Sequence, residues 1–343
     1  MDPHAPTHIR DTVLPVKLTT KMERIDTHAH FLPEFYRQAM IENGHTTPDG
    51  MPAIPPWDEQ SHVEFMNTRG ISKSYLSISS PGVHFGDDAA AKELARACNS
   101  HAAALSRRHA GKFGSFASLP LPDVNAALEE ISYALDELHA DGFTLLTNYH
   151  GIYLGDERFE RIFAELDKRH AKVFLHPTTG CSCIDGKPHP FRPLPYPSPM
   201  MEFFFDTSRA VVNLIMTGTV SRYTNMTYLL PHCGAVLPPL IDRFSNFATR
   251  ILGSNLGLTA DDIDRIFRER FYYDLAGFSM ENQIHGTLRR AGTDRLLYGS
   301  DYPYTPASGI AFQAATMDKE ASKLFTSEVV NDIYAGNAKL LFK

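Results

Sequence analysis

Two histidines separated by one residue are the first sign of chemistry in this chain. They are His28 and His30, in the segment RIDTHAHFLP. Alternate residues of an extended strand point to the same face, so both imidazoles can point to one place. The pair has two interpretations, as ligands of a metal ion or as polar residues that end a strand.

Three further polar residues lie at the C-terminal ends of short apolar runs. They are His176, His232 and Asp301. Taken singly, each could be a core histidine or a cap, and the chain holds 16 histidines. Their repeated placement favours one shared site. Imidazoles with a carboxylate suit a borderline divalent cation, with zinc favoured and manganese as the alternative.

Eight apolar or β-branched runs alternate with helical patterns along the chain. The predicted strands are residues 24–29, 72–79, 112–119, 142–148, 171–177, 226–232, 270–276 and 295–301. Helices are predicted between some of them, over residues 87–109, 123–140 and 156–170. This alternation predicts an α/β fold with parallel strands, as a single (β/α)8 TIM barrel. An open doubly wound sheet is the alternative, but no glycine-rich phosphate fingerprint follows the first strand.

The barrel is needed to bring the polar residues together, since the C-terminal ends of its strands meet at one rim. We expect an N-terminal arm over residues 1–23 and one barrel domain over 24–343. Residues 41–60 are loop-like, and the proline-rich residues 180–200 are expected to form a lid or wall. Residues 325–342 predict a C-terminal helix that closes the barrel.

Composition and charge exclude several classes of protein. The 343 residues are 43% hydrophobic and 21% charged, which is typical of a globular chain. A net charge of -7 without a basic run argues against a nucleic-acid partner. The sequence has no membrane-spanning run and no secretory signal, and its four cysteines lack disulfide-like spacing. A reducing compartment, the cytoplasm, is therefore expected.

The motifs DTHAH, LHP, PHCG and GSDYP together resemble those of the metal-dependent amidohydrolase superfamily. Their order over nearly the whole chain resembles the branch that contains aminocarboxymuconate-semialdehyde decarboxylase and γ-resorcylate decarboxylase. The segments HFLPEFYRQAM, PGVHFG and LPHCGAVLPPLIDRF are similar to the fungal 6-methylsalicylate decarboxylase group. The resemblance implies non-oxidative decarboxylation of a salicylate-type aromatic acid, with conversion of 6-methylsalicylate to m-cresol and CO2 as the expected case.

The resemblance also implies roles for the polar residues. His28, His30, His176 and Asp301 would bind one metal ion, and His232 would be the acid/base residue. Either His232 or Asp301 could deliver the proton to the ring carbon, and the sequence leaves that choice open.

Arg243 is the candidate for an intersubunit contact. It lies eleven residues after His232, where an arginine of the resembling semialdehyde decarboxylase reaches the neighbouring subunit's site. This implies a homodimer in which Arg243 binds substrate. A helix-surface arginine paired with Asp242 or a glutamate is the alternative.

Departures from the superfamily pattern narrow the chemistry. The segment GFTLLTNYHG has no lysine at the end of the fourth strand, where many hydrolases bridge two metals, so one metal and no organic cofactor are expected. Phe31, Trp57 and Tyr302 are expected to contact an aromatic substrate. The alternatives are a metal-dependent hydrolase of a lactone or amide, and a ligand-binding barrel without catalysis.

Overall fold

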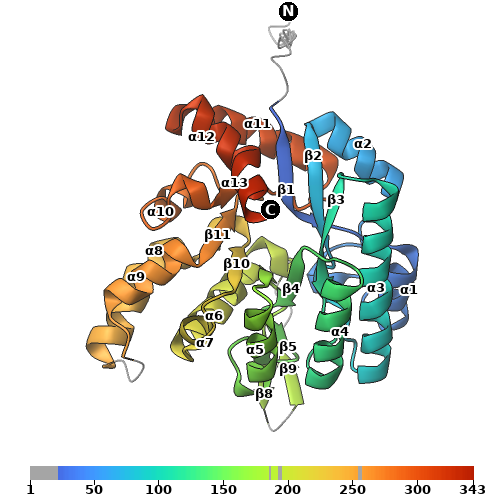
Figure 1. The fold of residues 1–343 in the computed structure, drawn as a ribbon, viewed down its shortest axis with the longest axis horizontal. Coiled ribbons are helices and arrows are strands. Elements are labelled where there is room, and N and C mark those ends of the chain that lie inside the picture. The colour runs from blue at the N-terminus through green and yellow to red at the C-terminus, as the bar shows by residue number, and fades with distance from the viewer. Residues whose placement is uncertain (1–21, 185–186, 192–194, 254–256) are drawn as a thin grey trace, which may run out of the picture.

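Eight parallel strands surround the centre of the molecule in a computed structural model that describes residues 22–184, 187–191, 195–253 and 257–343 (Figure 1). Each of the eight predicted runs overlaps one of these strands, so the predicted (β/α)8 barrel is confirmed. Around the sheet the strands are β1 Arg24–His30, β2 Ile71–Ser77, β3 Phe113–Ser118, β4 Gly142–Leu146, β7 Lys172–His176, β10 Thr227–Leu230, β11 Phe271–Asp274 and β12 Leu296–Leu297.

Backbone hydrogen bonds nearly close the ring between its first and last strands. The Thr27 amide donates to the Tyr298 carbonyl at 3.0 Å, and the His30 amide donates to the Tyr302 carbonyl at 2.7 Å. The segment that follows β12 is therefore held against β1. This seam brings residues from the two ends of the chain to the same part of the rim.

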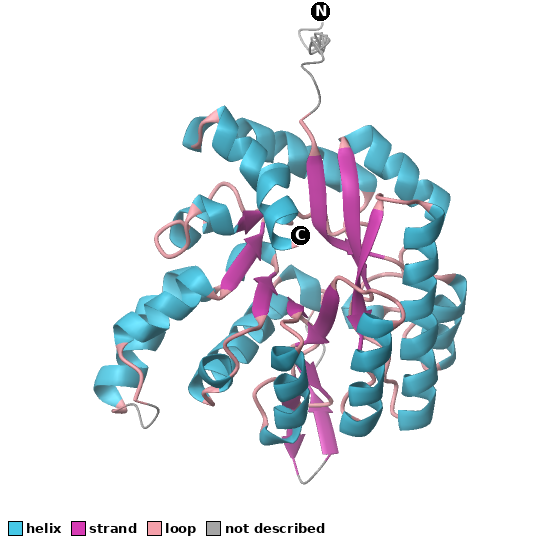
Figure 2. Ribbon diagram, in the orientation of Figure 1, coloured by secondary structure: helices cyan, strands magenta, loops and turns pink. Residues whose placement is uncertain are grey.

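Helices cover the outside of the ring (Figure 2). Predicted helices 87–109 and 123–140 are present, and each begins after an aspartate, Asp87 or Asp123, whose side chain accepts backbone N–H groups. The helices are α1 Glu34–Glu42, α2 Glu59–Arg69, α3 Asp88–Arg108, α4 Val124–Asp136, α5 Glu160–Lys168, α6 Glu202–Met216, α7 Thr219–Arg222, α8 Leu237–Asn246, α9 Ala260–Glu269, α10 Gln283–Thr287, α11 Ala307–Leu324, α12 Ser327–Asn331 and α13 Asn337–Leu341.

The C-terminal residues close the barrel, as predicted, although not as one helix. A π-helical turn, Asp332–Gly336, separates α12 from α13. From these elements and the residue after them, Ala335, Ala338 and Phe342 pack on one apolar cluster inside the ring. The strand residues of that cluster are Ile25, Tyr75, Phe116, Phe174, Leu229 and Leu297. A larger cluster lies between the strands and the outer helices.

The two insertions contain little regular structure. Within 41–60 there is one 3-10 turn, Pro48–Gly50. Segment 180–200 contains the antiparallel pair β8 Cys181–Ile184 and β9 Lys187–Pro190, while residues 185–186 and 192–194 lie outside the described residues.

A second antiparallel pair, β5 Asn148–Tyr149 and β6 Ile152–Tyr153, follows β4. Of the expected arm, residues 1–21 lie outside the described residues. Within the described part of the chain, no helix is both long enough and apolar enough to cross a membrane.

Candidate metal centre

A β-bulge sets the direction of the two histidines of β1. Between Asp26 and Ala29, three residue steps of β1 match two of β2, from Ser74 to Leu76. Ile25, before the bulge, packs inside the barrel, whereas Ala29, after it, packs in the outer cluster. The extra residue therefore exchanges the inner and outer faces, and His28 and His30 point inward.

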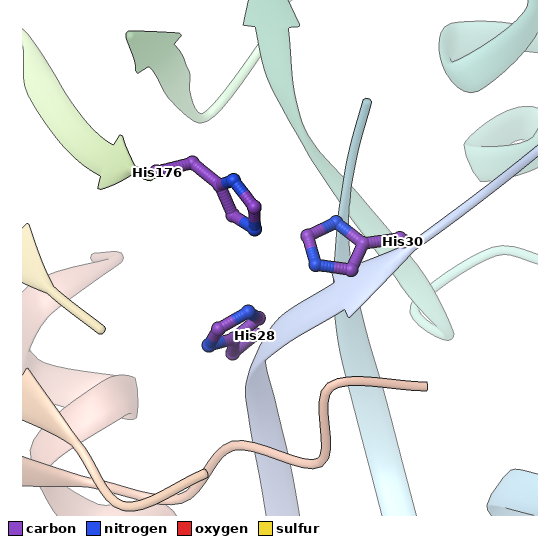
Figure 3. A group of neighbouring side chains, drawn as sticks. All are labelled: His28, His30 and His176. Carbon is purple, nitrogen blue, oxygen red and sulfur yellow. The ribbon is translucent and has the colours of Figure 1, made fainter. Parts of the chain in front are cut away.

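The imidazoles of His28, His30 and His176 converge above the apolar interior (Figure 3). One ring nitrogen of each lies within 4.8 Å of the others. The ring centroids of His30 and His176 are 4.8 Å apart, and those of His28 and His30 are 5.0 Å apart. All three side chains are buried. The predicted convergence of strands one and five is therefore present in the structure.

Each of the three rings has a hydrogen-bond partner for its Nδ1 atom. His28 Nδ1 lies 3.0 Å from Asp274 Oδ2, His30 Nδ1 lies 2.8 Å from Ser77 Oγ, and His176 Nδ1 lies 2.7 Å from the Pro177 carbonyl. The Ser77 hydroxyl donates to the Ala29 carbonyl, so its oxygen can accept from His30. A tautomer with hydrogen on Nδ1 satisfies all three contacts and leaves the Nε2 lone pairs directed into the cluster.

Asp301 supplies a carboxylate on the open side of the cluster. Its Oδ1 atom lies 3.5 Å from His28 Nε2 and 3.3 Å from His30 Nε2. Within the described residues, neither Nε2 atom has a hydrogen-bond partner, although both are buried. The unpartnered Nε2 atoms of His28 and His30, opposite Asp301 and beside the His176 ring, fit a divalent cation, because a buried polar atom without a partner is otherwise unfavourable. The residues present therefore fit the metal that the sequence predicts.

The surrounding charges favour a cation at this position. Burial lowers the pKa of His30 and His176, so their imidazoles stay neutral and can act as ligands. Burial also lowers the pKa of His28, but the charges of Asp274 and Asp301 outweigh burial and raise it to about 9. The negative charge that attracts a proton to His28 also attracts a metal ion, which competes with that proton.

Both neighbouring carboxylates remain ionised. Burial raises the pKa of Asp301, but its close contact with His30 and the charge of His28 bring the pKa below its ordinary value. Burial also raises the pKa of Asp274, but the charge of His28 and its hydrogen bond to Asp274 have the larger effect and lower that pKa. The cluster thus combines the neutral imidazoles of His30 and His176 and the negative charges of Asp274 and Asp301 with His28, whose extra proton a metal ion can displace.

His232 lies beside the cluster, in the turn His232–Gly234 that follows β10. Its ring centroid is 5.0 Å from that of His28, and its ring stacks on Phe204 at 5.3 Å. Burial, followed by the charge of His28, lowers its pKa. His232 and Asp301 have φ angles of 51° and 59°. Such left-handed conformations are uncommon outside glycine and collect at functional sites.

The aromatic residues expected at the substrate pack with neighbouring rings in the apolar cluster between the strands and the outer helices. Phe31 and Trp57 have ring centroids 6.1 Å apart, and the Trp57 indole donates to His62 Nδ1 at 3.0 Å. Tyr302 stacks on Phe65 at 4.2 Å.

Other rings lie directly against the histidines of the cluster. Tyr304 meets the His30 ring edge to face, with the two centroids 5.4 Å apart. Phe204 stacks on the His232 ring, with the two centroids 5.3 Å apart.

Arg243 lies on the exposed face of α8, and its ring contact is with Phe247 rather than with a ring of the cluster. Its guanidinium carbon is 5.8 Å from the centre of the Phe247 ring. The alternative partner Asp242 forms an ion pair with Arg290. Arg243 lines a groove of about 600 Å³ with mostly apolar residues, among them Phe205, Val212, Leu240, Phe244, Phe247 and Leu252.

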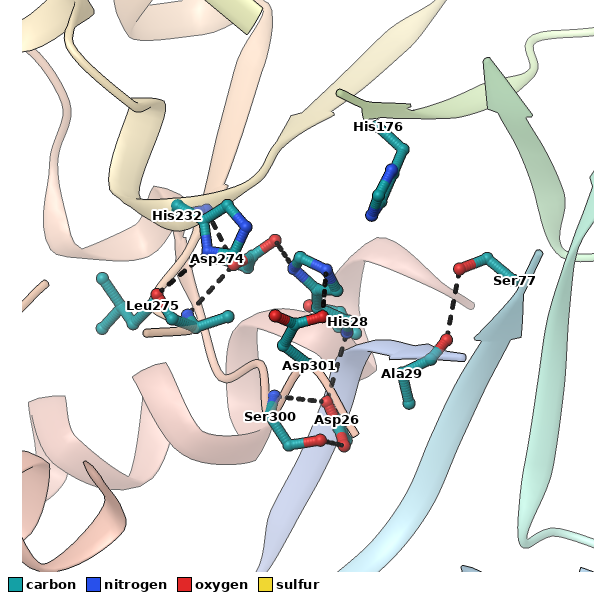
Figure 4. A network of polar contacts seen from close by, with 12 residues as sticks. Asp26, His28, Ala29, Ser77, His176, His232, Asp274, Leu275, Ser300 and Asp301 are labelled. Carbon is teal, nitrogen blue, oxygen red and sulfur yellow. Dashed lines mark hydrogen bonds and ion pairs between the residues drawn. The ribbon is translucent and has the colours of Figure 1, made fainter. Parts of the chain in front are cut away.

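Asp274 is the main contributor that the sequence reasoning missed. It ends β11 and contacts both His28 and the turn at His232 (Figure 4). The signal was present, because the run FYYDLA is a predicted strand that ends near a carboxylate, like the run ending at Asp301.

Comparison with known proteins adds to this geometry. The family model described as Amidohydrolase matches residues 25–343. The 6-methylsalicylic acid decarboxylase of Aspergillus aculeatus is 38% identical over 308 residues, which cover 88% of this chain and 90% of that protein.

Solved structures share the barrel. An amidohydrolase II is 33% identical with a TM-score of 0.83, over 93% of this chain and 99% of the other. The 5-carboxyvanillate decarboxylase of Novosphingobium aromaticivorans, crystallised with manganese and a nitrobenzoic acid, has a TM-score of 0.77 over 93% and 96% of the two chains. At 22% identity, this second likeness shows the fold alone.

Proposed function

The chain belongs to the amidohydrolase family, and we propose that it is a metal-dependent decarboxylase of a salicylate-type aromatic acid. The observation that carries the proposal is the convergence of the three imidazoles of His28, His30 and His176, with the Asp301 carboxylate opposite the first two. This arrangement lies in a chain 38% identical to a 6-methylsalicylic acid decarboxylase. 6-Methylsalicylate is accordingly the proposed substrate, and m-cresol and CO2 are the products.

In this proposal His28, His30, His176 and Asp301 hold one divalent ion. Zinc is the proposed metal because three imidazoles and one carboxylate suit it, and manganese is the alternative. The bound ion would withdraw electrons from the phenolate and carboxylate oxygens of the substrate. Metal analysis of the purified protein, followed by reconstitution of chelated protein with each ion, distinguishes the two.

His232 and Asp301 are the proposed proton-transfer residues. Decarboxylation needs one proton at the ring carbon that carries the carboxylate. As the carbon–carbon bond then breaks, its electron pair returns to the ring and CO2 leaves. His232 lies beside the cluster, and the stacked Phe204 ring restricts the orientation of its imidazole. Proton transfer of this kind contributes about 10²–10⁴-fold to a rate.

Aromatic side chains complete the proposed site. Tyr304 and Phe204, which touch His30 and His232, are placed to bound a substrate ring. Phe31, Trp57 and Tyr302 would form the wall behind them. A dry aromatic wall favours a benzene ring and strengthens the polar contacts within the site.

We also propose that the enzyme is a cytoplasmic homodimer in which Arg243 reaches its partner's substrate. The groove at Arg243 exposes large apolar side chains, with Phe205, Leu240, Phe247 and Leu252 each more than 40% exposed. Exposed apolar patches of this kind mark interaction surfaces. If the dimer forms, mixing inactive His232→Ala with inactive Arg243→Ala should restore activity. No recovery after confirmed subunit exchange would contradict this role of Arg243.

The test of the function is CO2 release from a panel of hydroxybenzoates. Metal-loaded protein should release CO2 from 6-methylsalicylate and salicylate, while 3-hydroxybenzoate, which lacks the ortho hydroxyl, should be inert. Chelated protein is the matched control. Hydrolysis of a lactone or amide without CO2 release would instead favour the hydrolase alternative.

A further inference from the structure

Asp274 connects the metal cluster to the turn that holds His232. Its Oδ2 atom is 3.0 Å from His28 Nδ1. Its Oδ1 atom accepts the backbone N–H of His232 at 3.1 Å and that of Ala276 at 3.0 Å. The residue is fully buried, and Figure 4 shows its carboxylate between the rings of His28 and His232.

The two oxygens of Asp274 contact different groups, Oδ2 the His28 ring and Oδ1 two backbone N–H groups. A carboxylate accepts hydrogen bonds and does not donate them, so Oδ2 selects the His28 tautomer with hydrogen on Nδ1. That tautomer leaves the Nε2 lone pair directed into the cluster. Oδ1 meanwhile accepts the backbone N–H of His232, in a turn where all three residues, His232, Cys233 and Gly234, have positive φ.

We infer that Asp274 is a positioning residue that fixes His28 in its metal-binding tautomer and fixes the backbone of His232 at the same time. This inference rests on the proposed function, because it assumes that the cluster binds a divalent ion. Carboxylate partners of ligand histidines typically change metal affinity by about 10–100-fold. Asp274 differs from the other two partners, Ser77 Oγ and the Pro177 carbonyl, because it carries a charge.

Asp26 offers a matched control for this inference. It is also fully buried and also lies beside His28, but it contacts the backbone rather than the ring. Asp26 Oδ1 accepts the N–H groups of His28 and Ser300 at 3.2 and 2.9 Å, and Oδ2 accepts the Ser300 hydroxyl. An asparagine there keeps both backbone contacts, and the Ser300 hydroxyl can turn to accept from the new amide.

The decisive variants are therefore Asp274→Asn and Asp26→Asn. Both replace a buried carboxyl group with an amide of nearly the same shape. At 274, an asparagine that keeps the two backbone contacts must turn its NH2 group to His28, which moves the hydrogen of that imidazole to Nε2. We expect metal affinity, measured by competition with a fluorescent chelator, to fall by about 10–100-fold in Asp274→Asn. In Asp26→Asn it should change by less than about threefold.

Turnover at saturating metal tests the second contact. Asp274→Asn keeps the acceptor for the His232 backbone, so its kcat should recover when excess metal is added. Asp274→Ala lacks that acceptor, so its kcat should stay low at any metal concentration. The thermal midpoint of metal-free protein, measured for each variant, separates these effects from a general loss of stability.

Equal metal affinity in Asp274→Asn and wild type would overturn the inference, and so would equal losses in the two asparagine variants. If Asp274→Asn does not fold, NMR of metal-loaded, 15N-histidine-labelled wild-type protein decides, with His28 assigned through His28→Gln, because the bound ion replaces the second proton of that ring. Hydrogen on His28 Nδ1 supports the inference, and hydrogen on Nε2 overturns it. Wild-type protein that binds no divalent ion would overturn the proposed function as well. Metal binding without CO2 release would contradict the function alone.

Discussion

The inside of the barrel is apolar at one end of its axis and polar at the other. Toward the N-terminal ends of the strands it is filled by apolar side chains, including Ile25, Phe116 and Leu229, and closed by the C-terminal elements. Toward the C-terminal ends it holds a cluster of histidines and carboxylates. Phe174 separates the two halves, with its ring 4.9 Å from that of His28.

The two halves are built from the same strands, so the difference lies in position along each strand. In β7, for example, Phe174 and His176 share the inner face and differ by one pleat. The half toward the N-terminal strand ends, here called the lower half, gains stability from apolar burial. The half toward the C-terminal strand ends, the upper half, holds the Nε2 atoms of His28 and His30, which a bound cation would satisfy. The apolar floor also excludes water below the histidines, which strengthens the electrostatic contacts above it.

The largest expected effect comes from His176→Ala, in the upper half. It removes one of three converging imidazoles, so metal content should fall below one ion per chain after dialysis. Turnover should fall by more than about 10²-fold, beyond the loss of a supporting partner alone. Metal analysis and CO2 release measure the two effects. Full metal content with normal turnover would show that the cluster is not the centre.

His232→Ala should separate metal binding from proton transfer. We expect the variant to keep its metal and to lose about 10²–10⁴-fold in turnover, because the proton-transfer group is removed while the three converging imidazoles remain. His45→Ala is the matched control, since His45 lies outside the cluster, on the wall of another pocket, and should leave both quantities unchanged. Near-normal turnover in His232→Ala would remove its acid/base role.

A substitution in the lower half should have the opposite signature. Leu229 is fully buried inside the barrel, and Leu229→Ala should lower the free energy of unfolding by about 2–5 kcal/mol. Metal affinity should stay close to that of wild type, because the cavity forms below Phe174. Urea unfolding of chelated protein and a chelator competition measure the two. Weakened metal binding without lost stability would show that the halves are not independent.

The smallest effect is expected at the end of the barrel. Phe342 stacks on Tyr75, with ring centroids 3.9 Å apart, but it is only partly buried. Phe342→Ala should therefore lower the free energy of unfolding by about 1–2 kcal/mol, less than Leu229→Ala. Urea unfolding measures the difference, and Phe342→Leu should recover part of it. A loss as large as that of Leu229→Ala would mean that the closure is as important as the interior.

Much of the fold could be predicted because its signals are local. Strands buried on both faces read as short apolar runs, and the helices over 88–108 and 124–136 follow aspartate caps. The hairpin that begins at Asn148, directly after β4, was not predicted. Its first residue, Asn148, is the last of the run 142–148, which reads as one continuous strand, and no glycine or proline marks the break before it.

The candidate site could be predicted in part, because histidine and aspartate at strand ends are visible in sequence. Asp274 was missed because nothing near it in the sequence indicates that its partner is His28, 246 positions earlier. The place of Arg243 on an exposed face of α8 could not be read from its offset from His232 either. Such pairings depend on which strand ends meet around the ring.

By itself the sequence determined the residue types of the centre and the order of the strands that bring them to one rim, because both are written along the chain. Only the tertiary structure decided how those side chains are aimed. The bulge between Asp26 and Ala29 turns His28 and His30 inward. Asp274, Ser77 and the Pro177 carbonyl contact the Nδ1 atoms of the three histidines, so the Nε2 atoms are left to bind a metal ion. Strand register and hydrogen-bond partners are properties of pairs of distant segments, so they exist only once the barrel has closed.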